Sequence, residues 1–367
     1  MQKIPTVVLG CTGIVGQQFV RMLSDHPYFE ITALTASTGS DGKKYNEVVN
    51  KTPDNSIPQK IRDQRLVNNS VDAVVKTGAK VVFCSLPAQI AQDIEKPLAA
   101  RGMFVFSNAR TNRMEPEVPI LIPEANPEHL MVVIRRASEK KGYIVTNSNC
   151  SATGLAIALK PLMDFGIRSV FVSTYQAISG AGRKGLLAFE ITGNVLPYIK
   201  GEEEKLESET LKILGRLING CFKPANLEVN ASCCRVPVID GHLETVIVEL
   251  EREVDIEILR ESFRSFRGIP QDLALPTAPD RPIIVSEEKN RPQPMLDACA
   301  GSPERAKGKA ISVGRIRKKR GRINFVLLAH NIIRGAAGTC ILNAEFALSQ
   351  GLLGNSVQHV YSERRIT

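Results

Sequence analysis

Short apolar runs alternate with helical patterns along the first third of the chain. The strands predicted are residues 5–10, 31–35, 80–85 and 103–106, and the helices are residues 13–23 and 88–100. A short apolar run bounded by turn residues is typical of a strand buried on both faces, as in a parallel sheet. Strands that alternate with helices therefore predict an α/β domain with a doubly wound, Rossmann-type parallel sheet.

The hydrophobic pattern changes after residue 150. Longer strands are predicted at residues 168–176 and 244–251, with a helix at residues 256–266 between later segments. This pattern indicates an α+β domain with a largely antiparallel sheet. The last helical pattern, residues 334–350, is expected to return and pack on the first domain.

The length of the chain points to two domains. A chain of 367 residues exceeds the size at which one hydrophobic core usually stops growing. We predict a first domain of residues 1–149, completed by a C-terminal helix within residues 331–367, and a second domain of residues 150–330.

The densest basic run is Arg315–Arg322, between two strand-like segments at residues 310–313 and 323–328. With a formal net charge of +9, the chain could attract an anionic substrate or a nucleic acid. It has no Trp and only 5% aromatic residues, so it offers few platforms on which bases could stack. We therefore predict a solvated hairpin tip rather than a nucleic-acid site.

The remaining composition excludes several classes of protein. No apolar stretch approaches the roughly 18 residues of a membrane span, so no membrane association is expected. The eight cysteines include no Cys-x-x-Cys pair, which predicts neither a metal site nor a disulfide framework. Reduced thiols, and a strand beginning too early to leave room for a signal sequence, favour a cytoplasmic location.

Cys150 is the strongest chemical signal in the chain. It lies in Tyr143–Gly154, where a β-branched run changes directly into a helical pattern. The first turn of a helix has unpaired N–H groups and the positive end of the helix dipole, and both favour a thiolate. Position alone leaves a second interpretation open, namely a small buried residue that closes a packing contact.

Three glycines follow the first predicted strand and open the first predicted helix: Gly10, Gly13 and Gly16. Glycines at this bend allow the backbone to turn tightly and approach a pyrophosphate, which favours dinucleotide binding over a merely structural turn. The segment after the second strand lacks the usual acidic partner of a ribose hydroxyl. Its hydroxyl residues, followed by Lys43 and Lys44, favour the 2′-phosphate of NADP over NAD.

Several further motifs span nearly the whole chain: Phe106–Met114, Ser148–Ser151, Tyr175–Gly182, Gly201–Lys205, Arg235–His242, Arg291–Pro294 and His330–Ala337. Together they resemble the aspartate-semialdehyde dehydrogenase family, within the glyceraldehyde-phosphate dehydrogenase superfamily. The fungal and archaeal type is the most similar.

The resemblance implies reversible oxidation of L-aspartate 4-semialdehyde with NADP and phosphate to L-4-aspartyl phosphate, which supplies the lysine, methionine, threonine and isoleucine branch. It implies that Cys150 is the nucleophile that forms a thioester and that His242 is the acid/base. Gln176 would orient the substrate beside the thiol. The family also forms dimers or tetramers through its second domain, which carries catalysis.

For the substrate, the resemblance implies a set of charged and polar side chains. Arg235 would hold the α-carboxylate, and Glu202 the amino group. Lys205 and Arg113 would hold phosphate, with a further hydrogen bond from Asn149. An extended segment with a turn before His242 would let Arg235 and His242 converge. Without the resemblance, the charges near Glu202 would suggest only a solvated helix face.

The cofactor residues expected by motif and resemblance lie at the ends of the predicted parallel strands and in two later loops. They are Gly10, Thr12, Gly13, Ile14, Val15, Gly16, Thr35, Ser37, Ser40, Lys43, Ser85, Leu86, Ser179, Gly180, Gly182 and Asn331.

The sequence departs from the family at two places. Most relatives carry an Arg in a Ser-x-Arg-Ser context, where this chain has Ser37-Thr-Gly-Ser40. Lys43 or Lys44 would replace that Arg, and the preference for NADP is expected to be weaker. Arg183 and Lys184 stand where relatives often have an aromatic residue and Pro, and either strengthen anion binding or only coat a loop.

Two other functions stay open from the sequence. An acyl-CoA reductase of the malonyl-CoA type would share the cofactor loop, Cys150 and His242. A non-catalytic NADP-sensing or RNA-binding protein would share the cofactor loop and the basic surface, but would have little reason to keep Cys150 with His242.

Overall fold

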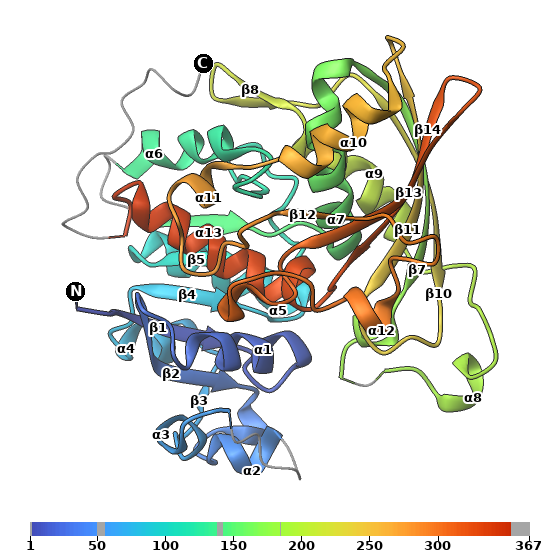
Figure 1. Ribbon diagram of the computed structural model, residues 1–367. Coiled ribbons are helices and arrows are strands. Elements are labelled where there is room, and N and C mark those ends of the chain that lie inside the picture. The colour runs from blue at the N-terminus through green and yellow to red at the C-terminus, as the bar shows by residue number, and fades with distance from the viewer. Residues whose placement is uncertain (1, 50–55, 138–141, 184, 354–367) are drawn as a thin grey trace. The chain divides into compact units, whose positions relative to one another are not determined.

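The computed structural model describes residues 2–49, 56–137, 142–183 and 185–353, and the chain forms two compact units (Figure 1). The first unit contains Met1–Leu121, Glu128–Asn147 and Cys340–Thr367. The second contains Ile122–Pro127 and Ser148–Thr339. Of the expected C-terminal helix, residues 354–367 lie outside the described residues, as does Lys184.

The first unit is built on a parallel sheet of six strands in the order β3-β2-β1-β4-β5-β6. Its elements are β1 (Ile4–Leu9), α1 (Ile14–Leu23), β2 (Phe29–Ala36), η1 (Thr38–Ser40), α2 (Tyr45–Val49), α3 (Gln59–Arg62), β3 (Val67–Asn68), α4 (Val71–Lys76), β4 (Val81–Cys84), α5 (Ala88–Ala100), β5 (Phe104–Ser107), η2 (Pro127–Leu130), α6 (Met131–Ala137), β6 (Tyr143–Thr146) and α13 (Gly338–Ser349). The predicted doubly wound sheet is confirmed.

Helix α13 joins the first unit from Cys340 onward, through a buried polar contact. Nε2 of His26 lies 2.8 Å from Oε1 of Glu345, and both side chains are fully buried. Nδ1 of His26 accepts the N–H groups of Tyr28 and Phe29, so the ring proton is on Nε2 and is donated to the carboxylate. A buried carboxylate needs such a donor, and this contact fixes α13 to the segment between α1 and β2.

The second unit contains a mixed sheet in the order β10-β7-β11-β14-β13-β12, with three antiparallel and two parallel pairings. Its elements are α7 (Cys150–Leu159), η3 (Lys160–Phe165), β7 (Ile167–Gln176), η4 (Ile178–Ala181), α8 (Ala188–Ile191), α9 (Glu202–Ile213), β8 (Arg216–Ile218), β9 (Cys221–Lys223), β10 (Glu228–Arg235), β11 (His242–Leu250), α10 (Ile256–Ser265), α11 (Ile269–Asp272), β12 (Ile283–Ser286), α12 (Pro294–Asp297), η5 (Glu304–Ala306), β13 (Ile311–Lys319), β14 (Arg322–Ala329) and a π-helical turn, η6 (Ile333–Ala337).

One face of the mixed sheet is covered by helices. Helices α7, α9 and α10 lie on the same side of it (Figure 1). From Ser151 to Leu159, every residue of α7 is buried, which suits a helix that is apolar on all sides. The opposite face carries partly exposed apolar pairs, with Phe171 opposite Ile247 and Tyr175 opposite Leu243.

The basic run forms a hairpin, but only its end is a tip. β13 continues to Lys319 and β14 begins at Arg322, so Arg320 and Gly321 alone form the turn, and both have positive φ. The prediction that the whole run Arg315–Arg322 forms the hairpin tip is therefore wrong, because most of the run belongs to the two strands. Ile316 is buried within the run, while the strand register shifts between Gly314 and Arg317 and Arg315 has a positive φ.

Among the described residues, no helix has the length and apolar character that a membrane span requires.

Candidate active site

Helix α7 begins at Cys150, which is half-buried. Asn149 is the N-cap, and its Oδ1 accepts the N–H groups of Ser151 at 2.9 Å and Ala152 at 3.1 Å. Gly335 packs closely on the nucleophile, since a Cβ there would lie 2.6 Å from Cβ of Cys150. The thiol thus occupies a fixed place in the first turn of α7, where the positive end of the helix dipole favours a thiolate.

Two rows of polar side chains cross the strands β10, β7 and β11 on the buried face of the sheet. In the first row, Arg235 pairs with Gln176, and His242 begins the next strand. In the second row, Thr174 pairs with both Cys233 and Glu244. Residues two apart on a strand face the same side, so the second row lies directly beneath the first.

The backbone of Ala177 brings Arg235 and His242 together. Its N–H donates to Nδ1 of His242 at 3.0 Å, and its carbonyl accepts from Nη1 of Arg235 at 2.8 Å. Gly180 leaves the space that both side chains need, since a Cβ there would lie 2.7 Å from Nη1 of Arg235 and 3.3 Å from Cε1 of His242. Burial lowers the pKa of Arg235, and the negative charge of the Cys150 thiolate raises it in part. The guanidinium therefore lies within electrostatic reach of the nucleophile.

His242 is held as a neutral ring. Burial, and then the Arg235 charge, lower its pKa from 6.5 to about 3. Because Nδ1 accepts the N–H of Ala177, the proton of the neutral ring is on Nε2, which has no hydrogen-bond partner in the described part of the chain. The ring is thus set to donate from Nε2. To take a proton from the thiol at Nε2, it would first have to break the hydrogen bond from Ala177.

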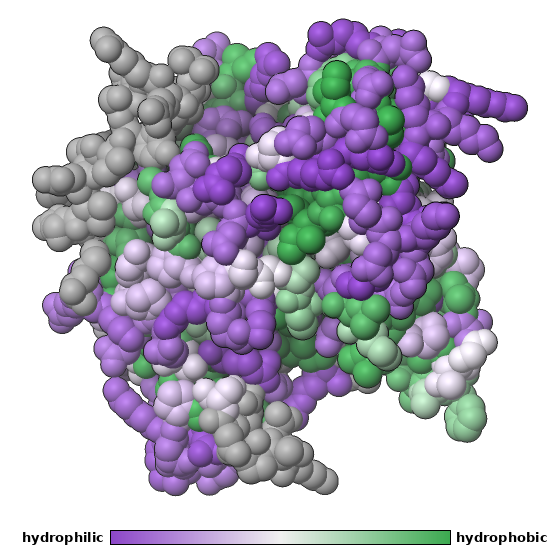
Figure 2. Space-filling model, in the orientation of Figure 1, coloured by the Kyte–Doolittle hydropathy of each residue, from purple (hydrophilic) through white to green (hydrophobic). Residues whose placement is uncertain are grey.

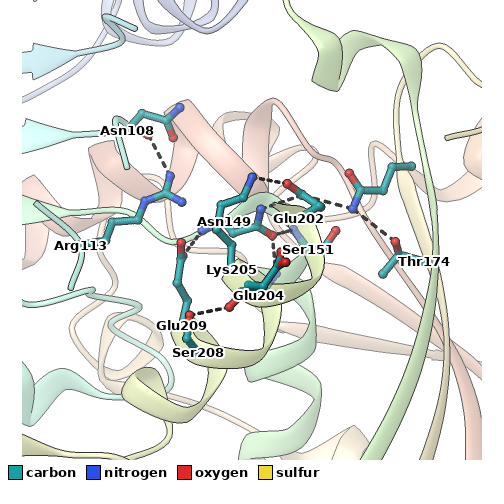
Figure 3. Close-up of polar contacts among 12 residues, drawn as sticks. Asn108, Arg113, Asn149, Ser151, Thr174, Glu202, Glu204, Lys205, Ser208 and Glu209 are labelled. Atoms are coloured by element: carbon teal, nitrogen blue, oxygen red, sulfur yellow. Dashed lines mark hydrogen bonds and ion pairs between the residues drawn. The ribbon is translucent and has the colours of Figure 1, made fainter. Parts of the chain in front are cut away.

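Glu202 is the hub of a hydrogen-bond network around the nucleophile (Figure 3). Its Oε1 accepts from Nδ2 of Asn149 at 2.7 Å and from Nε2 of Gln176 at 3.2 Å, and its Oε2 accepts from Nζ of Lys205 at 2.5 Å. Burial raises the pKa of Glu202, but the Lys205 charge and these hydrogen bonds outweigh it and hold the pKa below its usual value. Glu202 is therefore a fixed anion that orients three of the predicted site residues.

Arg113 lies in the first unit and is buried. One of its Nη atoms donates to the carbonyl of Asn108 at 2.9 Å (Figure 3). The side chain of Asn108 accepts from Nδ2 of Asn147. Loop geometry thus fixes the guanidinium for which the family resemblance implies a phosphate-binding role.

The glycine loop of the first unit has the form that a pyrophosphate needs. Gly10 has a φ of +72°, and a Cβ on Gly16 would lie 2.1 Å from the carbonyl oxygen of Gly10. Helix α1 begins at Ile14 without a side-chain cap, so its first N–H groups are available to an anion. Ser85 Oγ donates to the carbonyl of Leu9 at 2.9 Å, which draws the end of β4 to this loop. These residues fit a dinucleotide.

The remaining predicted cofactor residues lie in both units. In the first, Thr35 is buried and its hydroxyl bonds to Oδ1 of Asn69 at 2.5 Å. Nζ of Lys43 donates to the carbonyl of Gly39 at 2.8 Å beside the Ser37–Ser40 turn. Arg65, which the sequence analysis missed, donates to the carbonyl of Gly42 at 2.7 Å.

In the second unit, Asn331 connects two loops. Its Oδ1 accepts the N–H of Gly241 at 2.9 Å, and its Nδ2 donates to Oγ of Ser179 at 2.8 Å. Asn331 therefore fixes both the turn before His242 and the loop that contains Gly180 and Gly182.

Known proteins match both units. A model of the semialdehyde dehydrogenase NAD binding domain matches residues 6–132, and one of the semialdehyde dehydrogenase dimerisation domain matches residues 159–334. An aspartate-semialdehyde dehydrogenase of Methanothermobacter thermautotrophicus is 47% identical, over 92% of this chain and 97% of its own length. The chain belongs to the aspartate-semialdehyde dehydrogenase family. The predicted family is confirmed.

Two further similar proteins are informative about the cofactor and about the alternative function. The crystal structure of aspartate semialdehyde dehydrogenase with NADP from Candida albicans superposes with a TM-score of 0.86 at 38% identity, covering 95% of this chain and 99% of that one. A malonyl CoA reductase (NADP) of Metallosphaera sedula is 37% identical over 96% of this chain and 99% of its own length. Membership of the aspartate-semialdehyde dehydrogenase family therefore leaves the acyl-CoA reductase as the minor alternative.

Besides Arg65, the sequence analysis missed four contributors to the site. Thr174 and Glu244 lie in the second polar row, Glu209 contacts Asn149, and Ala177 acts through its backbone. Glu244 could have been noticed as an acidic residue that shares one face of a strand with Val246 and Val248, whereas Glu209 lies in a helix whose many charged residues hide it. The role of Ala177 could not be predicted from the sequence, because its backbone and not its side chain makes the contacts.

Glu244 gives a prediction about stability and pH. It is fully buried, and neither carboxyl oxygen has a hydrogen-bond partner among the described residues. Burial, and then the Glu202 charge, raise its pKa well above its usual value. A group whose pKa is higher in the folded than in the unfolded protein stabilises the fold at pH values below the unfolded pKa. As the pH rises towards the folded pKa, this stability is lost, by up to about 1.4 kcal/mol per pH unit.

Glu244→Gln is therefore expected to gain in stability relative to the wild type as the pH rises from about 6 to about 8. Urea unfolding of both proteins at the two pH values measures this. The contribution of His242 to the pH dependence has the opposite sign, because its pKa is lowered by folding and the fold is therefore favoured at pH values above the unfolded pKa. His242 is present in both proteins, so its contribution cancels in the difference between them. A difference that does not change with pH would show that Glu244 is ionised in the folded protein.

Proposed function

We propose that this chain is an aspartate-semialdehyde dehydrogenase that interconverts L-aspartate 4-semialdehyde and L-4-aspartyl phosphate, with NADP and phosphate. One observation supports this most strongly: a cysteine at a capped helix start shares a buried polar site with an arginine and a histidine held by one backbone residue. The aspartate-semialdehyde dehydrogenases among the relatives support the same substrate.

In this proposal, Cys150 attacks the carbonyl carbon and carries the acyl group as a thioester. Nε2–H of His242 donates to the oxygen of the tetrahedral adduct, where negative charge develops. When bound, the nicotinamide would supply or accept the hydride. Arg235 holds the substrate carboxylate through its planar fork.

Glu202 would also contact the substrate. Its carboxylate attracts the substrate ammonium while it also fixes Gln176, whose remaining amide oxygen is directed to the substrate. Lys205 and Arg113 are the cations for phosphate. Asn149 contributes at most one remaining amide hydrogen to this anion, since its side chain already caps α7 and donates to Glu202.

The glycine loop, Thr35, Ser85 and Leu86 would hold NADP in the first unit, and Ser179, Gly180, Gly182 and Asn331 would approach the nicotinamide. We propose that Lys43 and Arg65 replace the missing arginine at the 2′-phosphate. Both are tethered to backbone carbonyls of the segment that follows β2.

A steady-state assay tests the proposed activity. NADP reduction with aspartate semialdehyde is expected to require phosphate, with a higher kcat/KM for NADP than for NAD. Reduction of a CoA thioester without phosphate requirement would instead favour the malonyl-CoA type of reductase.

We also propose that two copies associate through the uncovered face of the mixed sheet. The family model that matches this region is a dimerisation domain. Apolar side chains also gather over α8 and α12 (Figure 2), where Phe189 and Met295 are almost fully exposed. Large exposed apolar patches mark protein interfaces. Light scattering is expected to give at least twice the 40.2 kDa of one chain, and a monomer at micromolar concentration would contradict the proposal.

A cytoplasmic location is part of the proposal. All eight cysteines are free in the structure, including the adjacent Cys233 and Cys234. Unpaired thiols persist in reducing compartments.

A further inference from the structure

Glu209 is a buried carboxylate beside the nucleophile for which the proposed reaction has no use. It lies on α9, is 2% exposed, and its Oε2 accepts the backbone N–H of Asn149 at 2.5 Å (Figure 3). Asn149 directly precedes Cys150. The carboxylate therefore contacts the peptide unit from which the nucleophile's helix starts.

Glu202 and Glu209 hold Asn149 from one helix. They are seven residues apart on α9, which places them two turns apart on the same face. Glu202 accepts from the side-chain Nδ2, and Glu209 accepts from the backbone N–H. The side-chain Oδ1 of Asn149 is bonded to helix α7, because it accepts the backbone N–H groups of Ser151 and Ala152.

The carbonyl of Asn149 is used as well. It accepts from the N–H of Thr153 at 3.0 Å and from Oγ1 of Thr153, also at 3.0 Å. Every polar group of Asn149 is thus engaged. A residue fixed in this way cannot rotate without breaking several buried hydrogen bonds, each of which is costly to leave unmade.

We propose that Glu209 is a positioning residue for catalysis, which holds the Cys150 thiol in place by accepting the backbone N–H of Asn149. Without an acceptor, this N–H is a buried, unpaired donor. The cap would relax to satisfy it, the first turn of α7 would loosen, and the thiol would lose its fixed place at the positive end of the helix dipole. This inference rests on the proposed function only in taking Cys150 as the nucleophile.

The test uses two variants and a matched control in the full-length protein. Glu209→Gln keeps an oxygen that accepts the N–H but removes the charge, and Glu209→Ala removes the acceptor. Ser208→Ala is the control, because Ser208 is half-buried and its hydroxyl donates to the carbonyl of Glu204 on the same helix rather than to Asn149. The measurements are kcat, KM and the rate of alkylation of Cys150 by iodoacetamide. The exposed Cys221 and Cys299 serve as references in the same molecule.

We expect Glu209→Ala to lower kcat about 10- to 100-fold with little change in KM, since small displacements of a reacting group cost this much. Alkylation of Cys150 should fall relative to Cys221 and Cys299, which a general loss of stability would not cause. Glu209→Gln should retain kcat within about threefold of the wild type, because the hydrogen bond persists. Ser208→Ala should behave as the wild type.

Wild-type kinetics in Glu209→Ala would overturn the proposal, and so would a loss in Glu209→Gln, which would assign the effect to charge. If Glu209→Ala does not fold, Glu209→Gln decides alone by the same criterion. Alkylation needs no substrate. If the wild type lacked the proposed activity but the variants changed Cys150 alkylation as described, the proposed function would fail and this positioning role would stand.

Discussion

Cys150→Ser is expected to lower kcat by roughly 10⁴-fold or more, because the nucleophile in covalent catalysis cannot be replaced by a group that does not ionise. The capped start of α7 and the nearby Arg235 favour a thiolate. Neither can ionise a serine hydroxyl, whose proton is held far more tightly. The stopped-flow rate of NADP reduction with aspartate semialdehyde measures the loss.

Cys221→Ser and Cys299→Ser are the controls for this experiment. Both cysteines are exposed and lie outside the polar site, so their replacement should leave kcat unchanged. Substantial activity in Cys150→Ser, or an equal loss in either control, would contradict the assignment of the nucleophile.

His242→Asn is expected to lower kcat about 10²- to 10³-fold, the usual cost of losing one donor to a developing oxyanion. The reason is geometric, since the neutral ring carries its proton on Nε2 and has no other group to which it donates in the described part of the chain. The shorter asparagine side chain cannot place an N–H at that position.

His242→Gln separates donation from base catalysis. The longer amide can place an N–H near the position of Nε2, so this variant should retain at least about tenfold more activity than His242→Asn. A general base would be lost equally in both variants, because neither amide accepts a proton. The wild-type kcat/KM should also lack a titration near the ordinary pKa of histidine, since the pKa of His242 is lowered to about 3. Equal losses, or such a titration, would favour the base role.

The sequence predicts the parts of the fold that depend on local pattern. Helix α5 matches its predicted range at both ends, and α7 begins at Cys150, because apolar periodicity and the break from strand to helix are local signals. β10 was not predicted, since its Glu, Asn and Ser residues have weak strand propensity and it is held by pairing with β7.

Only part of the site can be predicted from the sequence, because its geometry depends on strand register and on contacts between residues far apart in the chain. Motifs name Cys150, Arg235 and His242, but nothing in them indicates that Ala177 holds two of these residues through its backbone. A run of acidic residues on α9 suggests a solvated face. Only the packing of α9 against α7 shows that Glu209 faces the nucleophile.

The most direct test of the account is to trap the acyl group. The wild type is mixed with aspartate semialdehyde and NADP without phosphate, quenched in acid, digested, and analysed by mass spectrometry. The account predicts an aspartyl group on the peptide that contains Cys150, and its release when phosphate is added before the quench. An acyl group on another residue, or product formation without any covalent adduct, would contradict it.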